Sequence, residues 1–334
     1  MAERATIQQV SQIGVETSPG TNVAAAIRLP ATSIKLGINA DVKSFRAEGT
    51  KYAGIAALGK EWVVGDIAGL ACYSDLFYLL AGIMCKPEST QKGTTTAYAH
   101  EYELANAEPD DVATYSIEEG NPAAPGVGEV AAHECSYGLL TELGMAISRD
   151  SFDISGALIG RGFANLTTQM TAGTALDEVP ILPGDISIYL DEDEGDLGDT
   201  LLERVLKTSF KLGDRFNPVW ALNAAESSWA AHVERAPALT MTLQMAADAT
   251  GMALLDVMRA GSTRFIRLEA VSSELAGEGI PYKLQLDMAG KVTGVSKFSD
   301  VDGVYASEWT FTGTPALTGD VPCRVSLTNK IASI

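Results

Sequence analysis

The chain has 334 residues, a formal net charge of −19 and 46% hydrophobic residues, which predicts a folded globular protein of about two domains. Both halves share the negative charge, and no basic run interrupts it. Such a protein should repel nucleic acid and anionic membranes. The composition therefore argues against a protein that holds either of them through a basic surface.

No targeting segment or membrane span is predicted near the start of the chain. Residues 1–10 lack the apolar core of a signal peptide. The most apolar stretch, 67–84, is interrupted by Ser74 and Asp75, so we interpret it as a strand end followed by a buried helix. Ser74 is expected to cap that helix, which should cover about 75–84.

Two irregular segments follow in the chain. Residues 118–134 are rich in Gly and Pro and predict a long loop, and such loops usually lie on the surface and carry contacts. Residues 167–184 are rich in Thr, Gly and Pro and are interpreted as a linker. The predicted organisation is a first domain over 1–166, this linker, and a second domain over 185–334.

The second domain opens with the acidic run 191–199, followed by a predicted short helix from Leu201 to Leu206 with Thr200 and Glu203 as a capping box. Calcium prefers oxygen ligands, but this run lacks the residue order of an EF-hand loop. We interpret it as a solvated acidic turn and predict no metal site.

Strands with one apolar and one polar face dominate the rest of the chain. Leu and Met alternate with Thr and Gln over 239–245, and the same period of two recurs over 283–288 and 308–313. Antiparallel sheets allow this pattern. One further helix is expected near 251–260, starting at Thr250. Together these elements predict a mainly β (α+β) fold.

A repeat links the two halves of the chain. "TSIKLG" begins at Thr32 and "TSFKLG" begins at Thr208, 176 positions later. Flanking residues follow at nearly the same separation, so that Ile67 lies over Met245 and the two expected helices match. Because side-chain character is kept more than identity, we interpret the chain as a duplicated domain.

No catalytic constellation is recognised in the sequence. His100, His133 and His232 lack the spacing of a zinc site, and each is expected at the surface or at an interface. There is no nucleophile elbow and no phosphate-binding loop with its lysine. The four cysteines form no CxxC pair and are expected to be free buried thiols. We predict no enzyme, no catalytic residue and no cofactor.

The order of several segments resembles that of siphophage-type tail tube proteins. The similar segments are "QIGVETSPGTNVAAA" (12–26), "TYSIEEG" (114–120), "SFDISGALIGR" (151–161), the stretch 185–224, "VDGVYASEWTFTG" (301–313) and "VPCRVSLTN" (321–329). The resemblance covers nearly the whole chain and is carried by the order of these segments.

The resemblance implies two tandem β-sandwich domains, each with a flanking α-helix and with hairpins that join an inner β-barrel between subunits. Six such domains form a ring, so a duplicated chain would need three copies for a homotrimeric, pseudo-hexameric ring. Stacked rings form the tail tube of a bacteriophage virion, the channel for genome ejection. The implied partners are further copies, the terminator, tape measure and distal tail proteins, with assembly in the host cytoplasm and no membrane.

Phage DNA is expected to pass through this channel without specific binding, because each neutralised phosphate would add affinity. We therefore predict a net negative lumen. The candidate lumen residues come from the hairpin regions before the two helices: Asp41, Glu48, Asp66, Asp214 and Glu226. Lys35 and Lys211, which match in the repeat, are lysines that such a wall could tolerate.

Three other functions remain open at this stage. The chain could be another tail component, such as a tail terminator or a tube-tip protein, which would not stack into long tubes. An extracellular β-sandwich binding module would predict a signal peptide, paired cysteines and an exposed aromatic cluster, and the first two are not expected here. An enzyme would need the catalytic constellation that the sequence lacks.

Overall fold

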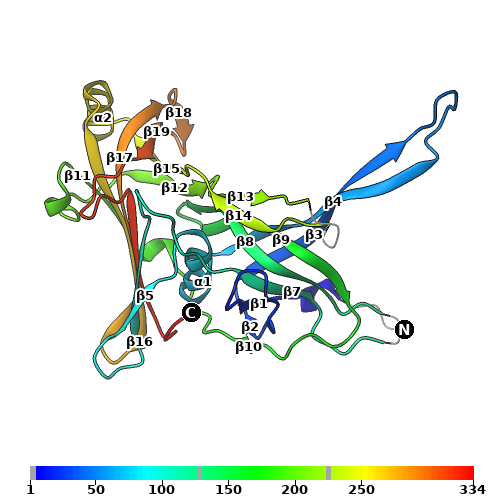
Figure 1. The fold of residues 1–334 in the computed structure, drawn as a ribbon. Coiled ribbons are helices and arrows are strands. Elements are labelled where there is room, and N and C mark those ends of the chain that lie inside the picture. The colour runs from blue at the N-terminus through cyan, green and yellow to red at the C-terminus, as the bar shows by residue number, and fades with distance from the viewer. Residues whose placement is uncertain (1–4, 127–128, 223–226) are drawn as a thin grey trace.

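The computed structural model describes residues 5–126, 129–222 and 227–334. The fold is mainly β, as predicted, with 54% strand and 10% helix (Figure 1). Two α-helices lie within the described residues, α1 (Tyr73–Ile83) and α2 (Ala249–Ala260). Short 3₁₀ turns are found at Thr6–Gln8, Pro183–Asp185 and Glu194–Asp196.

The strands before the predicted linker, and one within it, are β1 to β10. Their bounds are β1 (Val10–Val15), β2 (Ile27–Arg28), β3 (Thr32–Phe45), β4 (Ile55–Leu70), β5 (Glu88–Gln91), β6 (Tyr98–Glu103), β7 (Tyr115–Gly120), β8 (Ala132–Ile147), β9 (Phe152–Leu166) and β10 (Thr174–Ala175). Antiparallel pairing joins most of them in the order β1-β7-β8-β9-β4-β3.

The remaining strands follow the predicted linker. Their bounds are β11 (Ile186–Asp191), β12 (Val205–Gly213), β13 (Phe216–Val219), β14 (Ala231–Glu234), β15 (Ala238–Ala246), β16 (Thr263–Gly277), β17 (Ile280–Val295), β18 (Ser299–Val301), β19 (Val304–Gly313) and β20 (Cys323–Asn329). Antiparallel pairing gives the order β11-β16-β17-β19-β15-β12.

The two strand orders have the same topology. Strands β1, β3, β4, β7, β8 and β9 correspond to β11, β12, β15, β16, β17 and β19, and all five pairings in each set are antiparallel. Helix α1 follows β4 and contacts β8, and α2 follows β15 and contacts β17, the counterpart of β8. The pairing thus repeats as a duplication requires, while the domain boundaries at 166 and 185 stay a prediction.

The strand registers correct the alignment made from the sequence. Ile34 lies opposite Ile67, and Phe210 lies opposite Met241. If the two hexapeptides are equivalent, Ile67 corresponds to Met241, so the predicted match with Met245 was wrong. The error of four residues kept the same face of the sheet, because strand side chains alternate with a period of two.

The two halves share one sheet and one core. The end of β8 pairs with β12, from Leu143 opposite Leu212 to Ile147 opposite Thr208. A single sheet therefore runs in the order β3-β4-β9-β8-β12-β15-β19-β17. The β5–β6 hairpin of the first half pairs with β20, which pairs with β17. One hydrophobic cluster contains buried residues of both halves.

The helix caps differ from the predictions. Helix α1 begins after Cys72, so Ser74 lies inside its first turn and is not the cap. Helix α2 begins after Asp248, whose carboxylate accepts a hydrogen bond from the N–H three residues on (2.9 Å). Asp248, and not Thr250, is therefore the cap. Gly261, with φ of 63°, ends α2 in the left-handed conformation.

The short helix predicted from Leu201 to Leu206 is absent from the described residues. Leu201 forms a bridge with Tyr189, and β12 already begins at Val205. Leu202 is buried, and its N–H donates to a carbonyl of β11. Sheet pairing and burial of Leu202 thus outweigh the local capping signal.

The irregular segments take up defined positions. The predicted 118–134 loop is the β7–β8 connection, although its ends belong to the two strands and 127–128 lie outside the described residues. The segment predicted as the linker contains β10, which pairs with β2 in parallel. The N–H of Tyr73 donates to the carbonyl of Val179 (3.1 Å), so this segment packs back against α1.

Candidate functional site

One face of the continuous sheet is polar, and its residues lie opposite one another from strand to strand. Lys35 of β3 lies opposite Asp66 of β4, which lies opposite Ala157 of β9. Ala157 in turn lies opposite Glu142 of β8. Cross-strand partners share a face of a sheet, so these side chains form one row.

The polar face continues across the junction between the halves. Gly144, two residues after Glu142, lies opposite Lys211 of β12. Lys211 lies opposite Thr240 of β15, which lies opposite Thr312 of β19. Ion pairing also crosses the junction, because Lys211 Nζ lies 2.9 Å from Glu142 Oε1.

Carboxylates on this face lie beside lysines. Besides the Glu142–Lys211 pair, Asp66 is opposite Lys35, and Asp41 lies 3.0 Å from the Nζ of Lys43. Exposed ion pairs add little stability, but they place both signs of charge on the surface. These residues place both signs of charge on the face, and the net negative lumen stays a prediction.

The sequence-based lumen candidates are only partly brought together. Asp41 and Asp66 lie on β3 and β4. Glu48 lies in the turn between these strands, outside the paired residues. Asp214 lies just after β12 with φ of 54°. Glu226 lies outside the described residues, so the structure does not place it.

Sequence analysis missed Glu142, the carboxylate that joins the two halves on this face. Its strand has three register shifts against β9, which interrupt the simple alternation of polar and apolar residues. The pairing of β8 with β12 is also not encoded in any local pattern, because these strands are separated by the whole linker. The only available signal was the pair of equivalent lysines, Lys35 and Lys211.

The two outer strands of the sheet differ from the inner ones in having an open side. On β3, the described residues from Thr32 to Phe45 pair with β4 alone. On β17, the described residues Val292–Val295 pair with β19 alone. Unpaired N–H and C=O groups along such an edge can pair with another chain.

The β3–β4 hairpin projects from the body of the molecule as a long arm (Figure 1). Several large apolar side chains along it are exposed: Val42, Phe45, Tyr52, Ile55 and Leu58. Monomeric proteins rarely expose a contiguous apolar surface of this kind unless it serves a contact. The arm is therefore a candidate interaction surface.

The counterpart region after β12 instead folds back onto the first half. Its β13–β14 hairpin lies near Trp229, which is fully buried and donates from Nε1 to the carbonyl of Gly160 on β9 (3.0 Å). The ring of Trp229 lies 4.2 Å from that of Tyr137 on β8. The segment between β12 and β15 therefore packs on the first half, whereas the equivalent β3–β4 hairpin projects from the molecule.

Arg215 locks the two halves together from inside. Its side chain is 1% exposed and forms ion pairs with Asp110 (2.7 Å) and with Glu234. It also donates to the carbonyls of Ile83 (2.9 Å) and Met84 (3.1 Å) at the end of α1. A residue of the second half therefore satisfies carbonyl groups that the helix end leaves without partners.

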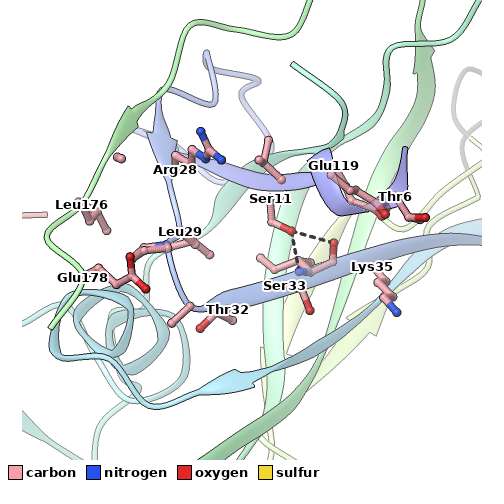
Figure 2. A pocket seen from close by; sticks show the side chains of 16 residues that line it. Thr6, Ser11, Arg28, Leu29, Thr32, Ser33, Lys35, Glu119, Leu176 and Glu178 are labelled. Atoms are coloured by element: carbon pink, nitrogen blue, oxygen red, sulfur yellow. Dashed lines mark hydrogen bonds between the residues drawn. The ribbon is translucent and has the colours of Figure 1, made fainter. Parts of the chain in front are cut away.

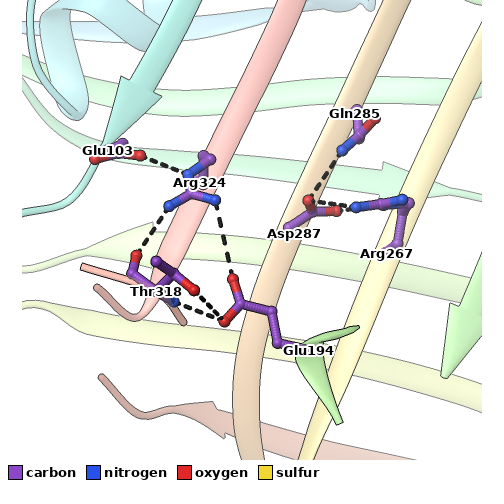
Figure 3. A network of polar contacts seen from close by, with 7 residues as sticks. All are labelled: Glu103, Glu194, Arg267, Gln285, Asp287, Thr318 and Arg324. Atoms are coloured by element: carbon purple, nitrogen blue, oxygen red, sulfur yellow. Dashed lines mark hydrogen bonds and ion pairs between the residues drawn. The ribbon is translucent and has the colours of Figure 1, made fainter. Parts of the chain in front are cut away.

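A polar network fixes the predicted acidic turn to the sheet (Figure 3). Glu194 accepts hydrogen bonds from the N–H (2.7 Å) and hydroxyl (2.8 Å) of Thr318, and Arg324 joins Glu194 to Glu103. Asp191 accepts from two backbone N–H groups of the same turn. These carboxylates are occupied structurally, and no group of potential metal ligands is found among the described residues.

The Ser89–His100–Asn329 contacts resemble part of a catalytic triad. His100 Nδ1 lies 2.8 Å from Ser89 Oγ, and Nε2 lies 3.0 Å from Asn329 Oδ1. However, His100 is fully buried against Phe77, and burial lowers its pKa. A ring with a lowered pKa is a weaker base, and a ring with no exposed surface is out of reach of a substrate. His100 is thus not at the surface but lies where β6 of the first half pairs with β20 of the second half.

The other histidines lie beside aromatic rings. His133 stacks on Phe163, with 5.0 Å between ring centroids. His232 approaches the hydroxyl of Tyr137 (3.0 Å) between the two halves, and burial lowers its pKa. Both contacts are those of structural residues.

The cysteines are free thiols, as predicted, and three of the four are buried. Burial raises the pKa of Cys85 to about 11 and that of Cys135 to about 12. Burial also raises the pKa values of Cys72 and Cys323. A thiol must be ionised to act as a nucleophile, so these four side chains are not activated.

No helix in the described part of the chain has the length and apolar character needed to cross a bilayer. Comparison with protein-family models and with curated proteins finds no match for this chain.

Proposed function

We propose that this chain is a non-catalytic structural subunit of a phage-type tail tube, in which copies of the chain form rings that stack around a channel. The observation that carries the proposal is the repeated topology. One sheet passes from the first half into the second through the β8–β12 pairing, with an open edge on β3 at one side and along Val292–Val295 of β17 at the other.

Ring formation follows from the way in which the halves are joined. The β8–β12 contact brings together two unlike edges of two equivalent units. An interface of this head-to-tail type makes a ring when its rotation closes. A chain that already contains two units would need three copies for a ring of six units, and closure would remove the open strand edges.

In the proposed ring, the polar sheet face forms the channel wall. Lys35 and Lys211 each have a carboxylate nearby, in Asp66 and Glu142. Beyond Lys211, the same row continues with Thr240 and Thr312. A carboxylate beside each of these two lysines lowers the uncompensated positive charge that they offer to phosphate, so DNA would be held less by counterion release.

The projecting arm supports stacking in the same proposal. It extends beyond the body of the chain (Figure 1) and exposes Phe45, Tyr52 and Ile55. Burying these side chains against another ring would remove apolar surface from water. The arm is thus assigned to contacts between successive rings.

Electron microscopy of the purified chain tests the proposal directly. The expected particles are rings with a central channel and, at high protein concentration, long tubes of stacked rings. A monomer that stays monomeric at all concentrations would contradict the proposal. Single rings that never stack would instead favour a terminator-like component.

A further inference from the structure

The second half of the chain contains a groove that is lined at one end by residues of the first half. The groove has a volume of about 340 Å³ and lies between β11 and β12. Ile147, Ser148 and Arg149, at the end of β8 and in the turn toward β9, form part of its lining. The turn of one unit therefore seats beside the β11–β12 pair of the next unit.

The first half has a larger groove at the equivalent place. It has a volume of about 670 Å³ and lies along β1 and β3, the counterparts of β11 and β12 (Figure 2). Its lining comes from the first half and from the predicted linker, and includes Ser11, Ile34, Leu29, Glu119 and Leu176. No turn equivalent to Ile147–Arg149 is among its lining residues.

Side chains occupy the edge of β3 in this groove. The hydroxyl of Ser11 accepts a hydrogen bond from the N–H of Ile34 (2.8 Å) and approaches its carbonyl (3.2 Å) (Figure 2). The carboxylate of Glu119 accepts from the N–H of Leu36 (2.9 Å). Side chains thus hold the N–H and carbonyl of Ile34 and the N–H of Leu36, which hinders indiscriminate pairing of the edge, and a strand that pairs here must displace them. In β12, the same edge pairs with β8.

The end of β17 and the turn after it are the counterpart of the β8 end and turn that line the groove of the second half. β17 is the counterpart of β8, and the N–H of Ser296 donates to β19 (2.9 Å). Because N–H directions alternate along a strand, the N–H of Val295 points to the open side. Large apolar side chains at this end are exposed: Val295 by 42%, Phe298 by 60% and Tyr305 by 76%.

We propose that the end of β17 and the turn after it, from a second copy of this chain, pair antiparallel with the edge of β3 and fill the groove beside β1. The register follows from the β8–β12 contact. Phe210 lies opposite Met145, and Leu212 opposite Leu143.

The equivalent residues across the new contact are found through the shared strand pairings. Val292 and Val295 lie opposite Phe311 and Trp309 of β19. These positions correspond to those of Leu143 and Met145 against β9. Val295 therefore faces Ile34, Val292 faces Leu36, and Ser296 faces Ser33. The inference rests on the proposed ring and names the edges that close it.

Cysteine pairs test this register in the full-length chain. The variant with Ser33→Cys and Ser296→Cys is mixed at assembly concentration and oxidised, and covalent multimers are measured on denaturing gels. The matched control carries Ser33→Cys and Val295→Cys, which a shift of one residue places on opposite faces. We expect at least about ten-fold more cross-linked chains in the test variant than in the control, with the unsubstituted chain as the background.

The outcomes separate this inference from the proposed function. Rings or tubes in micrographs without preferential cross-linking would overturn the register and leave the tube function standing. Preferential cross-linking in particles that are neither rings nor tubes would support the edge contact and contradict the tube function. If the variant neither assembles nor cross-links, the inference is overturned.

A second variant covers the case in which the cysteine pair disturbs assembly. Val295→Pro removes an N–H from the open side of β17 while leaving the hydrogen bonds to β19, a position where proline is tolerated. We expect a folded monomer with assembly reduced at least about ten-fold relative to Val295→Ala. Equal assembly of the two variants would contradict the proposed contact.

Discussion

Helices α1 and α2 occupy equivalent positions in the repeated topology but differ sharply in exposure. All 11 residues of α1 are buried, whereas only Gly251 and Leu254 are buried in α2. The difference arises because α1 lies under strands of both halves, including β8, β17 and β20. The comparison shows that the helix of one half is fully buried only where strands of the other half pack against it.

The sheet edges show the same contrast. The edge of β12 is covered by β8, and the equivalent edge of β3 is held by the side chains of Ser11 and Glu119. One junction is therefore complete within the chain, and its counterpart is open. We interpret the β8–β12 contact as a junction completed within the chain. The open edges of β3 and β17 are then the two sides of an equivalent junction with other copies.

The largest expected effect comes from breaking the completed junction at Arg215. Arg215→Met removes a buried cation and leaves Asp110 and two carbonyls of α1 without their donor. Breaking a buried ion pair from one side costs about 3–5 kcal/mol. We expect the free energy of unfolding, measured by denaturant titration of the monomer, to fall by that amount.

The matched control for this change is Arg259→Met. Arg259 forms an ion pair with Asp256 on the exposed side of α2, where both side chains are largely exposed. Its removal should have an effect of less than about 1 kcal/mol. Equal effects of the two substitutions would show that Arg215 does not hold the halves together.

The next largest effect concerns Asp75, a buried carboxyl in the first turn of α1. It accepts a hydrogen bond from the N–H of Ala31 (3.0 Å), and burial raises its pKa to about 6. The neutral form therefore stabilises the fold below about pH 4, and this contribution is lost as the pH rises through 6. The difference between a pKa of about 6 and the ordinary aspartate pKa of about 4 corresponds to about 3 kcal/mol.

Asp75→Asn keeps a neutral acceptor at this position. We expect the variant to be more stable than the unsubstituted chain at pH 8, by up to about 3 kcal/mol, with the difference vanishing towards pH 4. The measurement is the free energy of unfolding across this pH range. A constant difference would mean that Asp75 does not titrate in the folded chain. Gly251 lies at the equivalent place in α2, so only the first half carries this pH dependence.

The smallest effect on stability is expected on the polar face. Asp66→Asn with Glu142→Gln should change the free energy of unfolding by less than about 1 kcal/mol, because Asp66 is exposed and the Glu142–Lys211 ion pair is largely exposed. It leaves Lys35 and Lys211 uncompensated in both halves. If this face lines a channel, assembled tubes of the variant should bind duplex DNA more strongly than tubes of the unsubstituted chain. The increase should be larger at low salt than at high salt.

A matched control for the charge change is Glu274→Gln with Glu278→Gln. Both residues lie in and after β16 at exposed positions away from the paired rows. This variant has the same net charge as the test variant. If the two variants bind DNA equally, net charge and not the polar face determines the interaction.

Period-two patterns were enough to predict the mainly β fold, and the hexapeptide repeat pointed to two related halves. Local signals predicted where α1 and α2 lie, but they named the wrong caps, because Ser74 and Thr250 compete with neighbours whose geometry only the fold defines. The helix predicted from Leu201 failed for the same reason. Burial of Leu202 and pairing with β11 are tertiary effects that a local pattern does not contain.

The candidate site was harder to predict than the fold. Asp41 and Asp66 were assigned only to the hairpin region before the first helix, and the position of Asp66 opposite Lys35 became visible only with the strand register. Glu142 was missed because it meets Lys211 through the β8–β12 junction. Charge composition predicted a negative wall, but it could not show which carboxylates have a lysine beside them.

The most direct test is a reconstruction of the assembled ring by electron cryomicroscopy. We predict three chains per ring, with the contact between neighbouring chains repeating the internal β8–β12 junction as a pairing of β17 with β3. In that ring, α2 should be more deeply buried than in the isolated chain. Six chains per ring, or three chains joined through other surfaces with β3 and β17 left open, would contradict this interpretation.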